Sequence, residues 1–270
     1  MLTGGRSTIE QEGLCGMREE IFTVSGNHQI AESIFRMELD GNTEGITSPG
    51  QFVNVQLAGH YLRRPISVCD WSDGKLTIIY KVVGSGTLDM SRLKAGETLS
   101  LLTGLGNGYD LSDSENNHAQ NLGAVIVGGG VGVPPLYGLA KRLTEKGLRP
   151  AVILGFNTER ECFFCEEFAD LGLSVKITTL DGSKGRRGLV TDILSGQKYA
   201  YVCGPMGMLR AVYARVQDGQ FSFEARMACG FGVCMGCSMR TSECSKRICK
   251  DGPVLKHSEI VFSDAQHDGH

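Results

Sequence analysis

The chain lacks the features that mark membrane and secreted proteins. No apolar run reaches the roughly 18 residues that a helix needs to cross a bilayer, and the polar, Gly-rich residues 1–16 do not resemble a signal peptide. The net charge is only −3, and we find no basic patch or basic amphipathic helix. We therefore expect neither a membrane nor a nucleic acid among its partners.

Hydrolase motifs are also missing. The six histidines are scattered without an H-x-x-x-H spacing, and there is no nucleophile elbow or convincing Ser/His/Asp arrangement. What the sequence does contain is ten cysteines in 270 residues. Without a secretory signal, so many cysteines indicate metal or redox chemistry in a reducing cytoplasm rather than disulfide bonds.

The most specific pattern is a run of cysteines near the C-terminus. Cys229, Cys234 and Cys237 have the spacing C-x4-C-x2-C, and Cys244 and Cys249 follow. Three thiolates from one loop and a fourth from further along are the plant-type arrangement for a [2Fe–2S] cluster. Intervening glycines let the backbone fold tightly around such a cluster. Spacing alone does not choose between Cys244 and Cys249 as the fourth ligand.

The first part of the chain predicts a small antiparallel β-barrel. Short apolar runs are separated by turn residues such as Gly26-Asn27 and Asp73-Gly74. We expect strands over residues 21–24, 34–39, 52–57, 66–69, 76–83 and 98–102, and a short helix within 84–94. Residues 1–17 then form an N-terminal extension, and the barrel domain spans residues 18–112.

After a polar linker at residues 112–117, strands alternate with helices. We expect strands over 124–127, 151–154, 174–179 and 199–203, and helices from the proline pair to Gly147, over 161–171, over 189–194 and over 206–216. This alternation predicts a Rossmann-like parallel sheet with helices on both faces. The α/β domain then spans residues 113–221, a small cysteine-rich domain residues 222–262, and a disordered tail residues 263–270.

Two motifs lie at strand ends of the expected sheet. The glycine-rich turn at residues 128–134 joins a strand to a helix, where backbone N–H groups can approach the phosphates of a dinucleotide. It departs from G-x-G-x-x-G because Val133 replaces the third glycine, and a plain glycine turn is the alternative. Cys203 ends a later strand, so it can contact a nicotinamide or be a buried structural cysteine.

Weaker signals lie in the barrel, and one lies in the α/β domain. Arg63 and Arg64 could bind a pyrophosphate, together with the glycine-rich residues 84–87, or they could be solvated side chains beside an ordinary loop. Cys162 and Cys165 form a C-x-x-C, but no strand directly precedes it and no second pair lies nearby for zinc. We assign no redox role to this pair.

Together these motifs resemble the ferredoxin–NADP reductase superfamily, and within it the family of electron-transfer subunits of type B dihydroorotate dehydrogenases. The resemblance covers about residues 18–262. In Cys249-Lys-Asp251-Gly-Pro253 it matches a last ligand that precedes Asp-Gly-Pro, which favours Cys249 over Cys244. Many superfamily members have a tyrosine where this sequence has Ile66, and the isoleucine agrees with the dihydroorotate family.

The resemblance implies cofactors and residues for them. The barrel would bind FAD, the α/β domain NAD, and Cys229, Cys234, Cys237 and Cys249 a [2Fe–2S] cluster. Ser67, near flavin N5, and Cys203, near the nicotinamide, would be the catalytic residues. The implied FAD-binding residues are Arg64, Pro65, Ile66, Ser67, Val82, Gly84, Gly86 and Thr87. The implied NAD-binding residues are Gly128, Gly129, Gly130, Gly132, Pro134, Cys203, Gly204, Pro205 and Met206.

The resemblance also implies a reaction and a partner. Electrons would pass between NAD(H) and FAD as hydride, and singly through the cluster to the FMN of a separate catalytic subunit that oxidises dihydroorotate in pyrimidine biosynthesis. Two copies of each subunit would form a heterotetramer. The sequence does not settle NADH against NADPH, because no clear ribose-binding acid stands at 155–160 and Arg160 could be misread as a phosphate ligand.

Two other functions stay open from the sequence. One is the small flavin and iron–sulfur subunit of an NADH-dependent ferredoxin:NADP oxidoreductase or of a sulfide dehydrogenase, which would have the same domains. The other is a non-redox module that binds zinc through the same cysteines, although C-x4-C-x2-C is not a usual zinc spacing.

Overall fold

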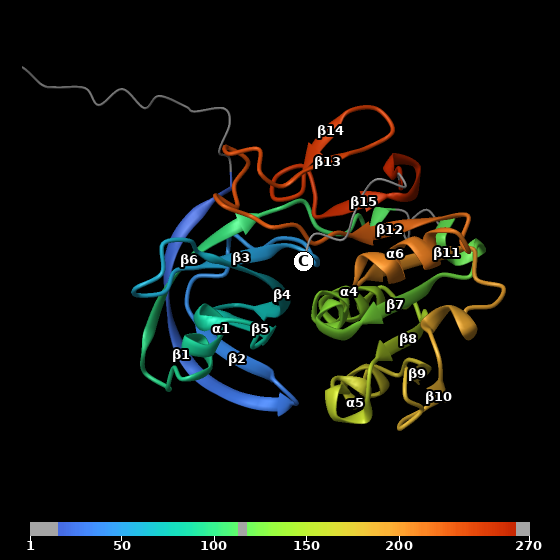
Figure 1. Cartoon of the computed structure of the whole chain (residues 1–270), viewed down its shortest axis with the longest axis horizontal. Helices are drawn as coiled ribbons and strands as arrows, with labels where there is room; N and C mark the ends of the chain where they lie inside the picture. Colours follow the sequence, from blue (N-terminus) through green and yellow to red (C-terminus); the bar gives the residue numbers. More distant parts are fainter. Residues whose placement is uncertain (1–15, 113–117, 263–270) are drawn as a thin grey trace, which may run out of the picture.

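The computed structural model describes residues 16–112 and 118–262. The linker residues 113–117, most of the N-terminal extension and the tail lie outside this range. A β-barrel and an α/β domain lie next to each other, and the cysteine-rich segment runs along one side of both (Figure 1). This arrangement confirms the expected fold class. Over the residues described, no helix is long and apolar enough to cross a bilayer.

Six strands close the barrel in the order β1-β2-β5-β4-β3-β6. They are β1 (Arg18–Ala31), β2 (Ile34–Asp40), β3 (Phe52–Val55), β4 (Arg64–Ser72), β5 (Lys75–Lys81) and β6 (Thr98–Leu105), and helix α1 (Ser85–Ser91) follows β5. Alternate side chains such as Phe22, Val24, Met37 and Leu39 point inward and are buried. Strand β1 is longer than expected because its two halves pair with different neighbours, β6 and β2.

A seven-stranded sheet forms the second domain, in the order β10-β9-β8-β7-β11-β12-β15, where β15 (Val254–Lys256) comes from the cysteine-rich segment. Its parallel strands are β7 (Val125–Gly129), β8 (Ala151–Phe156), β9 (Val175–Thr179), β10 (Arg186–Arg187), β11 (Tyr199–Cys203) and β12 (Asp218–Ser222). The helices are α3 (His118–Asn121), α4 (Val133–Glu145), α5 (Cys165–Asp170) and α6 (Met206–Tyr213), and the 3-10 turns are η1 (Gly130–Gly132), η2 (Glu159–Glu161) and η3 (Val190–Asp192).

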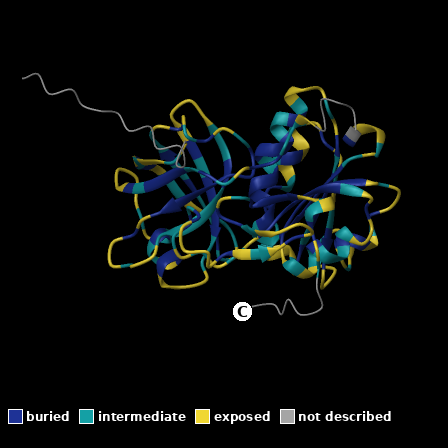
Figure 2. Ribbon diagram, turned by 90° about the horizontal axis from the view of Figure 1, so that it is seen from above, coloured by how far each residue is buried: buried dark blue, intermediate teal, exposed yellow. Residues whose placement is uncertain are grey.

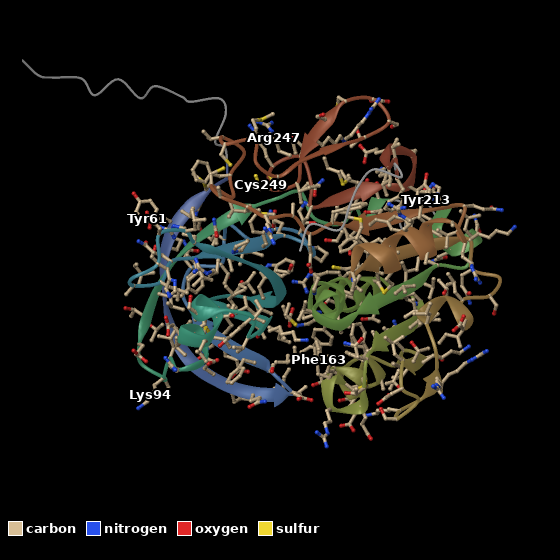
Figure 3. The ribbon with its side chains drawn as sticks, in the orientation of Figure 1. Tyr61, Lys94, Phe163, Tyr213, Arg247 and Cys249 are labelled. Carbon is tan, nitrogen blue, oxygen red and sulfur yellow. The ribbon has the colours of Figure 1, made fainter. Side chains whose placement is uncertain are left out.

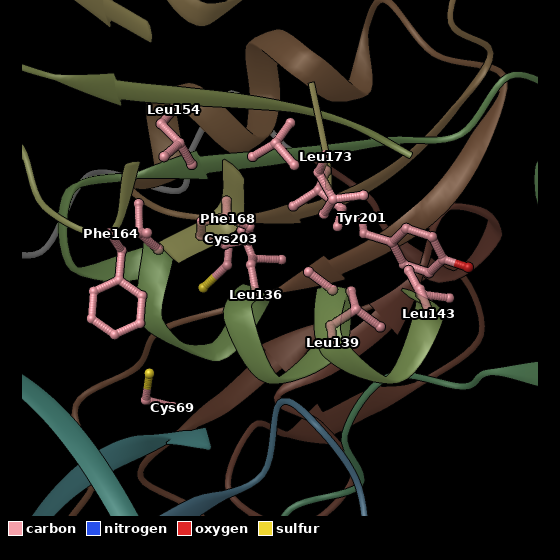
Figure 4. Packing of buried hydrophobic residues seen from close by; sticks show 14 of the residues in the cluster. Cys69, Leu136, Leu139, Leu143, Leu154, Phe164, Phe168, Leu173, Tyr201 and Cys203 are labelled. Atoms are coloured by element: carbon pink, nitrogen blue, oxygen red, sulfur yellow. The ribbon is translucent and has the colours of Figure 1, made fainter. Parts of the chain in front are cut away.

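Helices cover both faces of this sheet, as expected. On one face, Leu136, Leu139 and Leu143 of α4 pack with Leu154 and Tyr201 of the strands (Figure 4). On the other face, α6 contributes apolar side chains to a second buried cluster. Viewed from above, buried residues fill the interior of both domains, and exposed residues gather in the outer turns (Figure 2). The strand ends that border the cavities described below are therefore held by a continuous core.

Helix α4 also joins the two domains. At Gly138, a Cβ atom would lie 2.7 Å from the carbonyl oxygen of Cys69, so only glycine permits this approach to β4. Lys141 Nζ lies 2.6 Å from Asp70 Oδ2, and the Arg142 guanidinium stacks 4.0 Å above the Trp71 ring. These contacts fix the relative position of the barrel and the sheet.

The cysteine-rich segment has little regular structure. It contains the hairpin β13 (Ser238–Arg240) and β14 (Ser245–Arg247), then β15 (Val254–Lys256) and the 3-10 turn η4 (His257–Glu259). Strand β15 pairs antiparallel with β12 at the edge of the large sheet. The segment is therefore joined to the α/β domain by main-chain hydrogen bonds.

Several expected elements differ in extent. The helix expected over 161–171 is only α5, because Phe164 takes a left-handed conformation with φ 61° and both Phe163 and Phe164 turn into the core. The helix expected over 206–216 ends at Tyr213, and that over 189–194 is only the turn η3. Strands β12 and β15 were not predicted from the sequence, because their short runs lack a clear apolar alternation.

Candidate functional site

The four cysteines of the expected cluster form two pairs. Cys237 Sγ lies 3.2 Å from Cys249 Sγ, and the N–H of Cys234 donates to Cys229 Sγ at 3.4 Å. Within residues 16–112 and 118–262, no three His, Cys, Asp or Glu side chains surround one point as the ligands of a single metal ion do. Two pairs of thiols fit a cluster of two irons, in which each iron takes two cysteines.

Cys244 and Cys249 occupy different surroundings. Cys249 is 2% exposed and packs against Cys237. Cys244 is exposed and lies in the turn between β13 and β14, where its backbone bonds to Thr241. The structure thus pairs Cys249 with Cys237, whereas Cys244 is exposed in the hairpin turn.

Two glycines shape the loop that carries the first cysteines. Gly230 and Gly232 have φ values of +78° and +89°, which side chains rarely adopt. A Cβ at Gly230 would also lie 2.4 Å from Asn54 Nδ2, which donates to the carbonyl of Cys229. Burial alone would raise the pKa of the Cys229 thiol, but backbone N–H groups directed at its sulfur lower the pKa to about 6. The loop therefore favours the thiolate form of Cys229, which is the form that binds iron.

Arg247 connects the loop that carries the first cysteines with the turn that follows Cys249. Its Nε and Nη2 atoms bind the two carboxylate oxygens of Asp251 at 2.9 and 3.1 Å, and Nη1 donates to the carbonyl of Gly232 at 2.9 Å. The hydrogen bonds from Arg247 hold the pKa of Asp251 below its usual value. Arg247 lies beside Cys249 at the edge of the molecule (Figure 3). Arg247 was not predicted from the sequence, because a single positive charge in a loop has no distinctive signal.

A cavity of about 390 Å³ opens between the barrel, the sheet and the cysteine segment, and we call it the flavin cavity. The expected FAD residues Arg64, Pro65, Ile66, Ser67 and Thr87 all line it. Val82 packs against the barrel core instead, and its neighbour Val83 lines the cavity. Gly84 and Gly86 do not line the cavity: Gly84 is exposed and donates its N–H to Thr87 Oγ1, and Gly86 lies under the Arg64 guanidinium.

Cys203 and Glu224 face the same cavity from the far side. Burial raises the pKa of Cys203 to about 12, and the nearby Glu224 adds to the shift, so this thiol is neutral. Glu224 is open to solvent through the cavity, yet the surrounding protein raises the pKa of its carboxyl group above the usual value. Glu224 was not predicted from the sequence, because it follows β12, which was not predicted either.

Both ends of the cysteine segment form part of the cavity wall. Phe223, Ala225 and Met227 line the cavity just before Cys229, and Pro253 lines it just after Cys249. The N–H of Phe223 donates to the carbonyl of Pro253 at 2.9 Å, which joins the two stretches. A group bound in the flavin cavity would thus be separated from the cysteines by only a few residues.

A second cavity, of about 360 Å³, lies at the carboxyl ends of β7, β8 and β9, and we call it the nucleotide cavity. Gly129, Gly130 and Pro205 line it, and Met208 does so in place of Met206. Gly128, Gly132, Pro134 and Gly204 do not line it. At Gly132 a Cβ would be 2.4 Å from the carbonyl oxygen of Cys203, so a side chain would separate the glycine turn from β11.

Glu161 is the acidic residue of the nucleotide cavity. Its Oε2 accepts from Asn157 Nδ2 at 2.7 Å, and its Oε1 lies 3.4 Å from Lys81 Nζ in the barrel. The turn η2 folds Glu161 back toward the strand end, which no spacing rule anticipates. Arg160 does not line this cavity, and its carbonyl binds the N–H of Glu32 instead.

The C-x-x-C pair lies at the start of α5. Burial raises the pKa of Cys162 to about 11, and burial also raises the pKa of Cys165. Neither residue lines the flavin or the nucleotide cavity. Neutral thiols in this position do not have the low pKa of reactive redox pairs.

Sequence comparisons identify the family. Residues 224–261 match the iron–sulfur cluster binding domain of dihydroorotate dehydrogenase B. The electron transfer subunit of dihydroorotate dehydrogenase B (NAD(+)) from Fusobacterium nucleatum is 40% identical over 262 residues, which cover 90% of this chain and 99% of that protein. The chain belongs to this family. The same subunit from a Geobacillus species is 40% identical over 261 residues, covering 91% and 100% of the two chains.

Solved structures agree with this assignment. That of an NADH-dependent reduced ferredoxin-NADP oxidoreductase matches with a TM-score of 0.77 and 30% identity over 88% of each chain. The cytochrome P450 reductase GcoB of Amycolatopsis matches with a TM-score of 0.64 and 22% identity over 74% of this chain and 67% of that one, which supports the fold alone. The protein is thus an oxidoreductase, the electron transfer subunit of an NAD-dependent dihydroorotate dehydrogenase B, with an iron–sulfur domain and a flavin-binding fold.

Proposed function

We propose that this subunit carries electrons between NAD(H) and an FMN-containing catalytic subunit, through FAD in the flavin cavity and a [2Fe–2S] cluster on the cysteine segment. In pyrimidine biosynthesis, dihydroorotate would be the electron source and NAD the acceptor. One observation carries the proposal: the flavin cavity is lined by Phe223, Glu224, Ala225 and Met227, just before Cys229, and by Pro253, just after Cys249. When bound, a flavin exchanges a hydride with a nicotinamide and single electrons with a cluster.

The residues of the flavin cavity fit this task. Arg64 has a planar, permanently charged guanidinium suited to a pyrophosphate, and Thr87 lies beside it. Ser67, Cys203 and Glu224 surround the place where a flavin ring and a nicotinamide would meet. Because Cys203 is buried and neutral, its role is to shape this contact and exclude water rather than to act as a nucleophile.

We assign the cluster to Cys229, Cys234, Cys237 and Cys249. Their arrangement in two pairs, the burial of Cys249 and the backbone donors around Cys229 support this ligand set. Arg247 and Asn54 hold the loop from outside, as residues around metal ligands commonly do.

NADH is the nicotinamide that we propose for the nucleotide cavity. A carboxylate at this strand end can accept a hydrogen bond from the ribose 2′-hydroxyl of NADH, and it repels the 2′-phosphate of NADPH. Glu161 is the candidate for this role, since it lines the cavity. Lys81 and Asn157 hold its side chain in place.

The partner would be the FMN-containing catalytic subunit, in a heterotetramer with two copies of each chain. Electrons must travel from the cluster to the FMN, so the cysteine loop has to lie near the contact. Val233 and Met235 support this placement, because they are 71% and 54% exposed beside the cysteines. Phe231, in the same loop, packs partly against the buried core.

Spectroscopy and reduction assays test the proposal. The purified chain is expected to be yellow-brown, with about one FAD and about two irons per chain. NADH should bleach the flavin, and dihydroorotate should be oxidised only after the catalytic subunit is added. Oxidation of dihydroorotate by this chain alone would contradict the proposal, and copurification with a ferredoxin:NADP oxidoreductase subunit would favour that alternative.

A further inference from the structure

Two adjacent arginines at the start of β4 have different surroundings. Arg63 does not line the flavin cavity, and its Nη2 lies 2.5 Å from Glu19 Oε1 on the barrel surface. Arg64 does line the cavity, and its guanidinium covers Gly86, where a Cβ atom would lie 2.3 Å from Nε. Of the two, Arg64 is therefore the one that can meet a group bound in the cavity.

A histidine holds Arg64 in this place. Nη2 of Arg64 lies 2.8 Å from Nδ1 of His60, and Nη1 donates to the carbonyl of Leu62. On its other edge, Nε2 of His60 lies 2.8 Å from Oδ2 of Asp89 in α1. The His60 side chain is only 14% exposed, whereas that of Asp89 is 47% exposed, so the imidazole is largely shielded from water and the carboxylate is not.

The donors and acceptors of the series allow one arrangement. A guanidinium nitrogen can only donate, so Nδ1 of His60 must accept and carries no proton. The ring proton therefore resides on Nε2, from which it is donated to Asp89. The hydrogen bond from His60 holds the pKa of Asp89 below its usual value, so the acceptor stays ionised. Asp89 thus selects the tautomer of His60 that accepts from Arg64.

We propose that His60 is a positioning residue for FAD: oriented by Asp89, it fixes the guanidinium of Arg64 over Gly86, ready for the pyrophosphate. This inference rests on the proposed binding of FAD in the flavin cavity. His60 and the Leu62 carbonyl take two of the five N–H donors of Arg64, which leaves others for phosphate oxygens. A side chain that is already ordered loses less conformational freedom when its ligand binds.

The affinity for FAD tests this proposal directly. The full-length holoprotein is diluted, and the fluorescence of released FAD gives the Kd. Arg64→Ala should raise the Kd about 10- to 100-fold, because a hydrogen bond to a charged group is lost. His60→Leu should raise it about fivefold, and His60→Asn, whose Oδ1 can replace Nδ1 as acceptor, should recover part of that loss. His28→Leu, at an exposed position on β1 outside the cavity, is the control.

A double-mutant cycle separates positioning from a general effect on the fold. If His60 acts through Arg64, then His60→Leu should cause no further loss in a protein that already carries Arg64→Ala. Independent, additive losses would overturn the inference, as would a wild-type Kd in His60→Leu. An unchanged Kd in Arg64→Ala alone would instead contradict the proposed FAD site. The visible spectrum of the cluster and the Tm of each variant establish that it is folded.

Discussion

In the α/β domain, the nucleotide cavity is bordered by backbone at the ends of parallel strands, and a buried core holds those strands in place. In the cysteine-rich segment, the loop with three cysteines has no strand of its own. It is held by side-chain contacts from Arg247 to Gly232 and from Asn54 to Cys229, and by a hydrogen bond from the N–H of Ile248 to the carbonyl of Cys237. A cofactor site built on a sheet therefore shares the stability of the domain, whereas the cluster site depends on a few side chains and on the metal itself.

The strongest expected effect falls on a cluster ligand. Cys249→Ser should abolish the cluster, since a buried thiol of one pair is lost, while FAD binding and the fold of the α/β domain persist. Cys244→Ser is the matched control and should leave the cluster largely intact, because Cys244 is exposed in a turn. Iron content and the visible spectrum measure both. The reverse pattern would reassign the fourth ligand.

The next effect concerns the nucleotide cavity. Gly132→Ala places a methyl group 2.4 Å from the Cys203 carbonyl oxygen, so the glycine turn must move away from β11. We expect a lower Tm and an affinity for NADH reduced about tenfold or more, with the cluster spectrum retained. Gly207→Ala controls for folding only, because nothing lies within 4 Å of the added atom but Gly207 lines the same cavity. Loss of the cluster in Gly132→Ala would show that the two regions are coupled.

A variant next to the cluster cysteines tests how far their loop depends on single side chains. Arg247→Met removes the bidentate contact with Asp251 and the bond to Gly232, so the loop loses its outer support. Changes in residues that support metal ligands commonly weaken metal binding about 10- to 100-fold, and we expect iron chelators to remove the cluster correspondingly faster. The exposed Arg240 in β13 provides the control, Arg240→Met. Equal rates of cluster removal in the two variants would mean that Arg247 does not hold the loop.

The same contrast explains what the sequence could predict. The barrel strands, β7 and α4 follow from apolar periodicity, because burial in a core imposes that pattern. Cys249 could be chosen over Cys244 only through the resemblance, and burial now separates them. Arg247, Glu161 and Glu224 were missed because their positions depend on how loops fold back in space. A charged residue in such a loop has the same sequence signal whether it faces a cavity or the solvent.

Glu161 should determine the choice of nicotinamide. Glu161→Gln keeps the size of the side chain and removes its charge, so the repulsion of a 2′-phosphate disappears. The ratio of NADH to NADPH affinity should fall about tenfold, with unchanged cluster content. Glu159→Gln is the control, because Glu159 is exposed and does not line the cavity. Stopped-flow reduction of the flavin by each nicotinamide measures the ratio, and faster reduction of the wild type by NADPH would reject NADH as the natural cofactor.

The smallest effect on the isolated chain, and the one specific to the complex, concerns the exposed tip of the cysteine loop. Val233 and Met235 are exposed, whereas Phe231 in the same loop packs partly against the core. Val233→Ser combined with Met235→Ser should leave iron, flavin and Tm nearly unchanged, since neither side chain supports the fold. Association with the catalytic subunit should weaken about three- to tenfold if these residues form part of the contact, because only a minority of interface residues contribute strongly.

Leu62→Ser, at another exposed apolar position in the loop between β3 and β4, controls for a general loss of surface hydrophobicity. Sedimentation or titration calorimetry with the catalytic subunit gives the affinity, and binding equal to that of the wild type would place the interface away from the loop tip.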